Sequence, residues 1–229
     1  MDKIEHVFFD LDHTLWDFEK NSQETLAEIF NLFKLEALTN TSLHNFITRY
    51  QHHNTRMWRL YRENRMSKGR LRSARFEAVL ADFRVSDKPL AKQIGRYYIE
   101  HSPRKTAIHE GTVEILEHLS KRYELHVITN GFEEVQHLKL QCSAIDHYFK
   151  NVITSEMARA KKPDPRIFQT ALKITGGRPE TSIMIGDNYE VDVKGAEAVG
   201  WSAIHFVPHY VGDADRTIGK LLELKRILA

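Results

Sequence analysis

The chain has 229 residues, of which 41% are hydrophobic and 28% charged, and its formal net charge at pH 7 is +2. This composition is ordinary for a folded globular protein, and the near balance of charge does not by itself suggest nucleic acid, so we expect no nucleic acid polymer as partner. The single cysteine, Cys142, excludes an intrachain disulfide, and no apolar run is long enough for a signal peptide or a membrane span. We therefore expect a cytoplasmic protein with no membrane partner.

The first predicted element is a buried strand at residues 4–9, a short apolar run that stops at Asp10. About a hundred residues then follow with almost no strand signal, far more than an ordinary connection within one sheet contains. Helical patterns fill this interval at residues 22–33, 43–61, 68–83 and 89–101. We therefore expect residues 17–105 to form a separate helical domain, whose two junctions with the rest of the chain are natural hinges.

Further short apolar runs predict strands at residues 125–128, 182–185 and 203–207, with a weaker one at 151–153. Helical patterns lie between most of them, at residues 112–122, 133–141, 165–174 and 191–199. Strands that alternate with helices predict an α/β fold with a doubly wound parallel sheet. This Rossmann-like core would comprise residues 1–16 and 106–229.

Two aspartates follow the first predicted strand. Asp10 comes directly after it and Asp12 lies two residues further on, and open α/β sheets bind ligands outside the carboxyl ends of their strands. Two neighbouring carboxylates repel each other, so we expect a divalent cation held by Asp10 or a proton on Asp12. Taken alone, an Asp-x-Asp sequence is equally consistent with a simple turn after a strand.

Polar residues also follow the second predicted strand and precede a later helix. Thr129, Asn130 and Gly131 offer a hydroxyl and backbone amides that suit a phosphate oxygen, although a glycine turn before a helix explains them equally well. Further on, Pro163 holds Lys162 extended, so this lysine can point inward. Paired lysines, however, are usually solvated at a protein surface.

The strand predicted at residues 182–185 leads into a third polar group. Gly186 and Asp187 follow it directly, and Asp192 lies five residues beyond Asp187. Acidic side chains directly after a buried strand suit a cation that prefers oxygen ligands, such as Mg²⁺. The alternative is a helix cap, in which Asp192 favours the positive end of the helix.

Taken together, these residues resemble the haloacid dehalogenase superfamily of phosphatases over nearly the whole chain. The four motifs of that family are matched, in order, by Asp10-Leu11-Asp12-His13-Thr14, by Thr129, by Lys162 in preference to Lys161, and by Gly186, Asp187 and Asp192. The helical domain also stands where the family inserts its cap, between the first and second motifs.

The resemblance implies a catalytic mechanism and a magnesium site. Asp10 would attack phosphorus and form an aspartyl-phosphate, and Asp12 would act first as general acid and then as general base. Mg²⁺ would be held by Asp10, by the backbone carbonyl of Asp12 and by Asp187, while Asp192 would orient the metal site.

The remaining matched residues would bind the substrate. Thr129 and Lys162, together with the backbone amides around Asn130 and Gly131, would hold the oxygens of the transferring phosphoryl group. The substrate would be a small phosphomonoester, and we expect the protein to be a monomer or a homodimer.

Four other classes of protein are alternatives to this phosphatase interpretation. A phospho-receiver module would need neither the large insertion nor an acid/base two residues after the nucleophile. A haloacid dehalogenase would differ at the position of Asp12 and would lack metal aspartates such as Asp187. A sugar phosphomutase shares all four motifs and stays open. A catalytically silent protein is disfavoured because every motif position is filled.

The helical domain contains a basic stretch. Residues 49–75 include nine Arg or Lys residues against Glu63 alone, and one helical face carries Tyr50, Met57, Trp58 and Tyr61. Nucleic-acid binding is one interpretation, but an amphipathic helix with a solvated basic face is favoured over it. His52 and His53 are adjacent and face different sides, so we expect solvated histidines there rather than a metal site.

A finer resemblance concerns residues 7–18, 128–132 and 57–76, which look most like a bacterial branch of pyrimidine 5′-nucleotidases, with phosphoglycolate phosphatases next. That resemblance implies a nucleoside monophosphate as substrate. The base of such a substrate needs a flat or polar contact, and Trp58 and Tyr61 are the candidates in the helical domain, although core packing also explains Trp58.

Overall fold

The computed structural model describes residues 4–212 and 216–228. Residues 1–3, 213–215 and 229 belong to the predicted core segments and lie outside the described residues. The chain divides into a core unit, Met1–Phe18 with Thr106–Ala229, and a helical unit, Glu19–Lys105.

The core unit is built on a parallel sheet with the strand order β3-β2-β1-β4-β5-β6. Its strands are β1 (His6–Phe9), β2 (Glu124–Thr129), β3 (Asn151–Thr154), β4 (Ser182–Gly186), β5 (Ser202–Phe206) and β6 (Thr217–Ile218). The predicted doubly wound parallel sheet is confirmed. Among the strands of the described residues, the sequence missed β6 alone, because its two residues are too few to show a periodic pattern.

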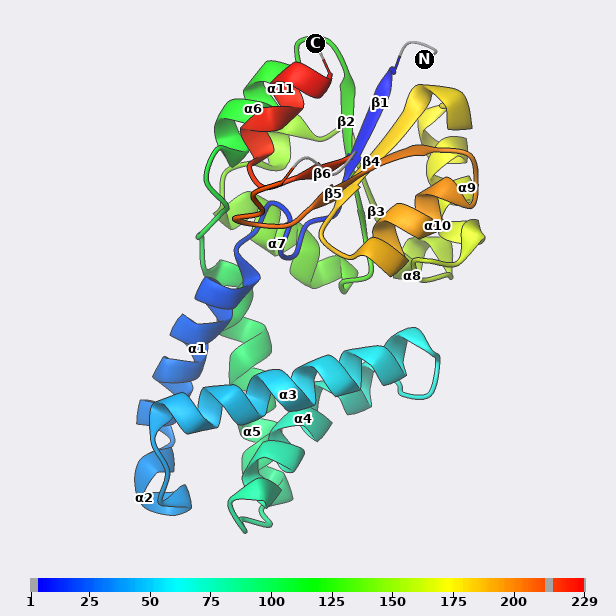
Figure 1. The fold of residues 1–229 in the computed structure, drawn as a ribbon. Coiled ribbons are helices and arrows are strands. Elements are labelled where there is room, and N and C mark those ends of the chain that lie inside the picture. The colour runs from blue at the N-terminus through cyan, green and yellow to red at the C-terminus, as the bar shows by residue number, and fades with distance from the viewer. Residues whose placement is uncertain (1–3, 213–215, 229) are drawn as a thin grey trace. The chain divides into compact units, whose positions relative to one another are not determined.

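Helices cover both faces of this sheet (Figure 1). Val7 and Phe9 point to one face and pack with side chains of α6 (Thr112–Leu119), α7 (Glu133–Cys142) and α11 (Leu224–Ile227). Phe8 points to the other face and packs with α9 (Pro165–Thr175) and α10 (Lys194–Glu197). Because both faces are buried, the strands read as unbroken apolar runs in the sequence.

The order of the strands determines where a ligand can bind. β1 pairs with β2 on one side and with β4 on the other, and Phe9 lies opposite both Val127 and Ile185. The chain therefore winds outward in opposite directions from β1, and the residues that follow these strands meet at one edge. A switch in winding direction at the carboxyl ends is where open α/β sheets bind their ligands.

Short elements complete the core unit. They are η2 (Asp146–Tyr148), α8 (Ser155–Ala158), η3 (Pro179–Thr181), the π-helical turn η4 (Tyr189–Val193) and η5 (Leu221–Glu223). The helix predicted at residues 191–199 is thus divided between η4 and α10.

The helical unit consists of α1 (Phe18–Leu32), α2 (Leu35–Thr39), α3 (Leu43–Arg62), α4 (Lys68–Asp82), α5 (Lys88–His101) and the turn η1 (Ser102–Arg104). The side chains of Ser42, Ser67 and Asp87 cap α3, α4 and α5 by accepting a backbone hydrogen bond in the first turn. The unit has its own apolar core, formed by residues such as Leu26, Phe46, Phe76 and Ile94. No described helix of the chain is long and apolar enough to cross a membrane.

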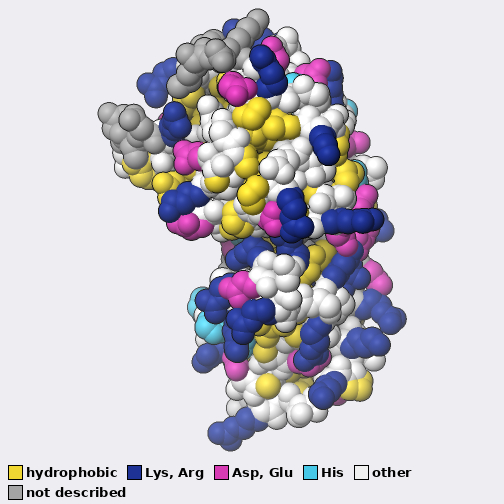
Figure 2. Space-filling view, turned by 90° about the vertical axis from the view of Figure 1, so that its right-hand side faces the viewer, with side chains coloured by type: hydrophobic (Ala, Val, Ile, Leu, Met, Phe, Trp, Pro, Cys, Tyr) yellow, Lys and Arg dark blue, Asp and Glu magenta, His cyan; other side chains and the backbone are white. Residues whose placement is uncertain are grey.

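The basic stretch of α3 and α4 is partly neutralised within the helical unit. Arg75 is buried, lies 4.6 Å from the ring centre of Tyr98 and donates a 2.9 Å hydrogen bond to Asn54. Other basic side chains of the stretch pair with acidic neighbours, as Arg70 does with Glu77. Figure 2 shows acidic side chains among the basic ones on one face of the molecule.

One histidine of this stretch differs from its prediction. His53 is buried and its Nε2 lies 2.9 Å from Asp82 Oδ2, whereas the neighbouring His52 is exposed. The prediction of a solvated side chain was therefore wrong for His53, because this face of α3 packs against the end of α4.

Candidate active site

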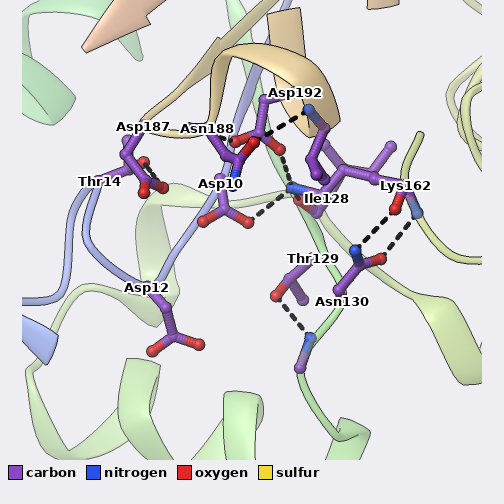
Figure 3. Close-up of polar contacts among 12 residues, drawn as sticks. Asp10, Asp12, Thr14, Ile128, Thr129, Asn130, Lys162, Asp187, Asn188 and Asp192 are labelled. Atoms are coloured by element: carbon purple, nitrogen blue, oxygen red, sulfur yellow. Dashed lines mark hydrogen bonds and ion pairs between the residues drawn. The ribbon is translucent and has the colours of Figure 1, made fainter. Parts of the chain in front are cut away.

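Side chains from four separate segments meet at the carboxyl edge of the sheet (Figure 3). Asp10 follows β1, Thr129 ends β2, and Asp187 follows β4. Lys162 comes from the loop before α9 and lies among them. Residues far apart in the sequence converge here because parallel strands place their carboxyl ends on the same edge.

Lys162 is the buried cation of the site. Its side chain is only 1% exposed, and its Nζ donates hydrogen bonds to Asp10 Oδ1 at 2.6 Å and to the carbonyl oxygen of Ile128 at 2.7 Å. Nζ also lies 2.6 Å from Asp192 Oδ1, an ion pair whose geometry falls outside that of a hydrogen bond. Burial alone would lower the pKa of Lys162, but Asp10 and Asp192 outweigh it and raise the pKa to about 12.

Asn130 holds the backbone of Lys162 in place. Its Oδ1 accepts a 2.7 Å hydrogen bond from the amide of Lys162, and its Nδ2 donates at 2.9 Å to the carbonyl oxygen of the same residue. The side chain of Asn130 therefore positions the lysine, and the substrate contact expected of the backbone amides around Asn130 stays a prediction.

Three carboxylates gather beside Lys162. Oxygens of Asp10, Asp187 and Asp192 lie within 4.8 Å of one another. Burial raises the pKa of Asp10 well above its usual range; Lys162 opposes this rise, and Asp192 and Asp187 add to it. Burial and then the charge of Asp192 raise the pKa of Asp187 to about 6.

These three carboxylates fit a magnesium ion. One buried ammonium, that of Lys162, faces three carboxylates, so the cluster keeps an excess of negative charge. All the clustered donors are oxygens, which Mg²⁺ prefers. Asp10, Asp187 and Asp192 are therefore the residues that would hold the ion, and the raised pKa values of Asp10 and Asp187 are what crowded, buried carboxylates show without a cation.

Gly186 makes room for this cluster. A Cβ atom at Gly186 would stand 2.4 Å from Asp192 Oδ2, far inside van der Waals contact. The Oδ2 atom also accepts a 3.1 Å hydrogen bond from the amide of Asn188, which fixes the turn of η4. The glycine of the Gly-Asp pair is thus explained by the close approach of Asp192.

Asp12 lies apart from the acidic cluster, and its side chain points away from Asp10 and Asp187 (Figure 3). Its Oδ1 forms a short ion pair with Lys139, and its Oδ2 accepts a 3.0 Å hydrogen bond from Gln136. Burial raises the pKa of Asp12, but Lys139 and Gln136 outweigh it and the net pKa is lowered. Of the two alternatives predicted for this pair of carboxylates, the proton on Asp12 is disfavoured in this conformation, because Lys139 compensates the charge.

Lys139 and Gln136 are the site residues that the sequence analysis missed. Both project from α7 and are almost completely buried, at 5% and 0% exposure. The available signal was a lysine and a glutamine three residues apart on a helix that starts after a motif residue, since such residues share one helix face. The ammonium of Lys139 also lies 4.1 Å from the ring centre of Trp16.

Thr129 is oriented by hydrogen bonds to its oxygen. Oγ1 accepts from the amide of Gly131 at 3.0 Å and from Nε2 of Gln136 at 2.8 Å. Both contacts use the oxygen as acceptor, so the hydroxyl proton remains the donor that Thr129 can offer to a ligand. A Cβ atom at Gly131 would stand 2.3 Å from Gln136 Cδ, so only glycine lets Gln136 reach both Thr129 and Asp12.

Trp58 and Tyr61 belong to α3 in the helical unit. Their rings are in edge contact, with centres 5.5 Å apart. Tyr61 is buried with 6% exposure, whereas Trp58 is half-buried. Trp58 is thus the more accessible of the two, and its predicted contact with a substrate stays a prediction.

This fold and site define a hydrolase class: an α/β sheet that presents an aspartate, a buried lysine and an acidic cluster at its carboxyl edge. The chain belongs to the haloacid dehalogenase-like hydrolase family, whose model matches residues 4–200.

Known proteins similar to the chain differ in their substrates. The pyrimidine 5′-nucleotidase YjjG of Escherichia coli is 27% identical, over 99% of this chain and 98% of its own. A glyceraldehyde 3-phosphate phosphatase of Methanothermobacter thermautotrophicus is 30% identical, over 88% and 84% of the two chains. The solved structure of the hydrolase YfnB of Bacillus subtilis, bound to magnesium, has a TM-score of 0.89 at 24% identity, with 99% of each chain covered.

Proposed function

We propose that this hydrolase is a Mg²⁺-dependent phosphatase that acts on pyrimidine nucleoside 5′-monophosphates through an aspartyl-phosphate on Asp10. The coarser assignment, a phosphoric monoester hydrolase, rests on family membership and on phosphatase relatives of similar length. The observation that carries the proposal is the position of Asp10, which Lys162 holds at 2.6 Å beside Asp187 and Asp192.

In the first step, Asp10 attacks phosphorus. One carboxylate oxygen of Asp10 forms the new bond while the bond from phosphorus to the leaving oxygen breaks. Lys162 fixes the other oxygen of Asp10, and we propose that it and the Thr129 hydroxyl donate hydrogen bonds to the phosphoryl oxygens. A bound Mg²⁺ supplies charge neutralisation between the nucleophile and the phosphate.

Asp12 acts as the general acid and then as the general base. In its acid form it protonates the leaving oxygen, and the resulting carboxylate then takes a proton from the water that attacks the phosphoryl group. That water displaces Asp10 and releases inorganic phosphate. Because Lys139 holds the carboxylate in the described conformation, we propose that Asp12 leaves this ion pair before it donates a proton.

We expect Asp12→Asn to reduce kcat by about 10²–10⁴-fold on a nucleoside monophosphate, since an amide cannot transfer the proton. In kcat/KM, which reports the steps up to departure of the leaving group, the loss should be much smaller for p-nitrophenyl phosphate, whose leaving group needs no protonation. Initial rates on both substrates, with the melting temperature measured for each protein, test this. Equal losses in kcat/KM on the two esters would contradict a role of Asp12 as general acid.

The choice of a pyrimidine nucleotide rests on the similarity to YjjG over both chains and on the aromatic pair of α3. A phosphoglycolate phosphatase, a sugar phosphomutase and a phosphatase of three-carbon phosphates stay as alternatives on the same catalytic residues.

We expect deoxyuridine and thymidine monophosphates to be hydrolysed with higher kcat/KM than phosphoglycolate, glyceraldehyde 3-phosphate or glucose phosphates. Measurement of phosphate release from each of these esters with Mg²⁺ tests the ranking. A sugar phosphate or three-carbon phosphate with the highest kcat/KM would refute the nucleotide substrate but not the phosphatase assignment.

The role of the helical unit is tested separately. We propose that Trp58 contacts the nucleoside, because remote binding energy raises kcat/KM only for substrates large enough to reach it. Trp58→Ala should then lower kcat/KM for the nucleotides while leaving p-nitrophenyl phosphate nearly unchanged. Arg56→Ala, at an exposed position on the same helix, is the matched control. A uniform loss on every ester would contradict a contact between Trp58 and the leaving group.

A further inference from the structure

A second group of metal-ligating side chains lies at the opposite ends of the strands. His6 begins β1, while Asp10 follows its last residue. In the register of the sheet His6 lies opposite Glu124, and Phe8 lies opposite His126. Side chains two residues apart on a strand share a face, so His6, Glu124 and His126 are neighbours on one face of the sheet.

The distances within this group match those of a metal site. His6 Nδ1 lies 3.3 Å from His126 Nε2 and 3.7 Å from Glu124 Oε2, and all three atoms lie within 4.8 Å of one another. Ligand atoms that bind Zn²⁺ tetrahedrally at about 2.0–2.1 Å are separated by roughly 3.3–3.4 Å. The two histidine nitrogens therefore already have the required spacing. The distance from His6 Nδ1 to Glu124 Oε2 would have to shorten by a few tenths of an ångström.

The surroundings orient both imidazoles and keep that of His126 neutral. Burial, and then repulsion by His6, lowers the pKa of His126 to about 4, so its nitrogen lone pair is available at neutral pH. The other ring nitrogen of His126, Nδ1, lies 3.2 Å from Nδ2 of Asn151. When Nε2 binds an ion, Nδ1 carries the proton, and the Asn151 amide turned by 180° would accept it through its oxygen, as the outer partners of metal-binding histidines do. Backbone at Gly177 packs over the His6 ring, where a Cβ atom would stand 2.8 Å from Cδ2.

Access to the group is from the side of Glu124, whose side chain is 41% exposed. Its other oxygen, Oε1, pairs with Lys150, which is 61% exposed and can swing away. Two imidazoles and one carboxylate are a donor set that suits zinc and related ions, in contrast to the all-oxygen cluster around Asp10.

We propose that His6 Nδ1, His126 Nε2 and Glu124 Oε2 form a second, structural metal site that binds a divalent transition ion of the zinc type. The ion would join β1 to β2, the two strands that lead into Asp10 and Thr129. Without an ion, the same two ring nitrogens lie within hydrogen-bond distance of each other.

The test uses Co²⁺ as a spectroscopic probe and Zn²⁺ as its competitor, on the full chain with excess Mg²⁺ to occupy the carboxylate cluster. We expect one equivalent of Co²⁺ to give the visible absorption of a four-coordinate site, and Zn²⁺ to bleach it. Zn²⁺ should also raise the melting temperature, because an ion that binds only the folded protein stabilises it. His6→Asn should abolish both signals.

Two surface variants keep the test decisive if His6→Asn folds poorly. Glu124→Gln removes a ligand at a half-exposed position and should weaken Co²⁺ binding by at least about 10-fold. Lys150→Gln frees the same carboxylate and should leave the affinity unchanged or increase it. The proposal is overturned if no Mg²⁺-insensitive absorption appears, or if the absorption survives in both His6→Asn and Glu124→Gln, since the ion would then sit on other histidines.

Discussion

Asp10→Asn is expected to reduce kcat by at least about 10³-fold, because an amide oxygen cannot form the acyl-phosphate that carries the reaction. The fold should persist. Burial already disfavours the charged form of Asp10, and Lys162 keeps its contacts with Asp192 and the Ile128 carbonyl oxygen in the variant. The melting temperature of the variant should therefore be no lower than that of the natural protein.

Rapid quenching of a reaction with labelled substrate gives a second measurement of the same prediction. The natural protein should carry one labelled phosphoryl group per chain during turnover, and Asp10→Asn should carry none. Asp146→Asn, a change at an exposed aspartate of the same unit, is the control and should behave as the natural protein. Normal turnover by a folded Asp10→Asn protein would eliminate Asp10 as the nucleophile.

Removal of divalent metal is expected to abolish hydrolysis, and Mg²⁺ should restore it fully. The physical reason is the excess charge of the site: Asp10, Asp187 and Asp192 face one buried ammonium, and a dianionic phosphate adds to the repulsion. Asp187→Ala should raise the Mg²⁺ concentration for half-maximal rate by at least about 10-fold, since it removes a predicted ligand. Titration of chelated protein with Mg²⁺ measures both effects.

Glu190→Ala is the matched control for this titration, because Glu190 is an exposed acid of the turn after β4 and pairs only with Lys194 among the contacts described. Its Mg²⁺ requirement should equal that of the natural protein. Full activity in chelator would show that the reaction needs no metal and would favour a dehalogenase-type mechanism on the same fold.

The positions of the catalytic candidates followed from local sequence patterns. Short apolar runs predict strands buried on both faces, and the residues directly after such runs must lie at the carboxyl edge of a parallel sheet. Asp10, Thr129 and Asp187 were placed in this way, and the structure brings all three together with Lys162. A strand of two residues, β6, carries no such pattern and was missed.

The partners of those candidates depend on contacts between segments distant in the sequence. Lys139 is 127 residues from Asp12, and no local pattern indicates that its ammonium neutralises that carboxylate. The charge state of Asp12 could therefore not be predicted, because a pKa depends on the groups that surround a side chain in space.

The same reason applies to the proposed second metal site, formed by His6, Glu124 and His126. His6 and His126 are separated by 120 residues, and each alone is only a polar residue in a short, mostly apolar segment. Only the pairing of β1 with β2, and the register that sets His6 opposite Glu124, brings the nitrogens to metal-binding distance. Strand order and register arise from the packing of the whole sheet, whereas the apolar runs that form its strands are local properties of the sequence.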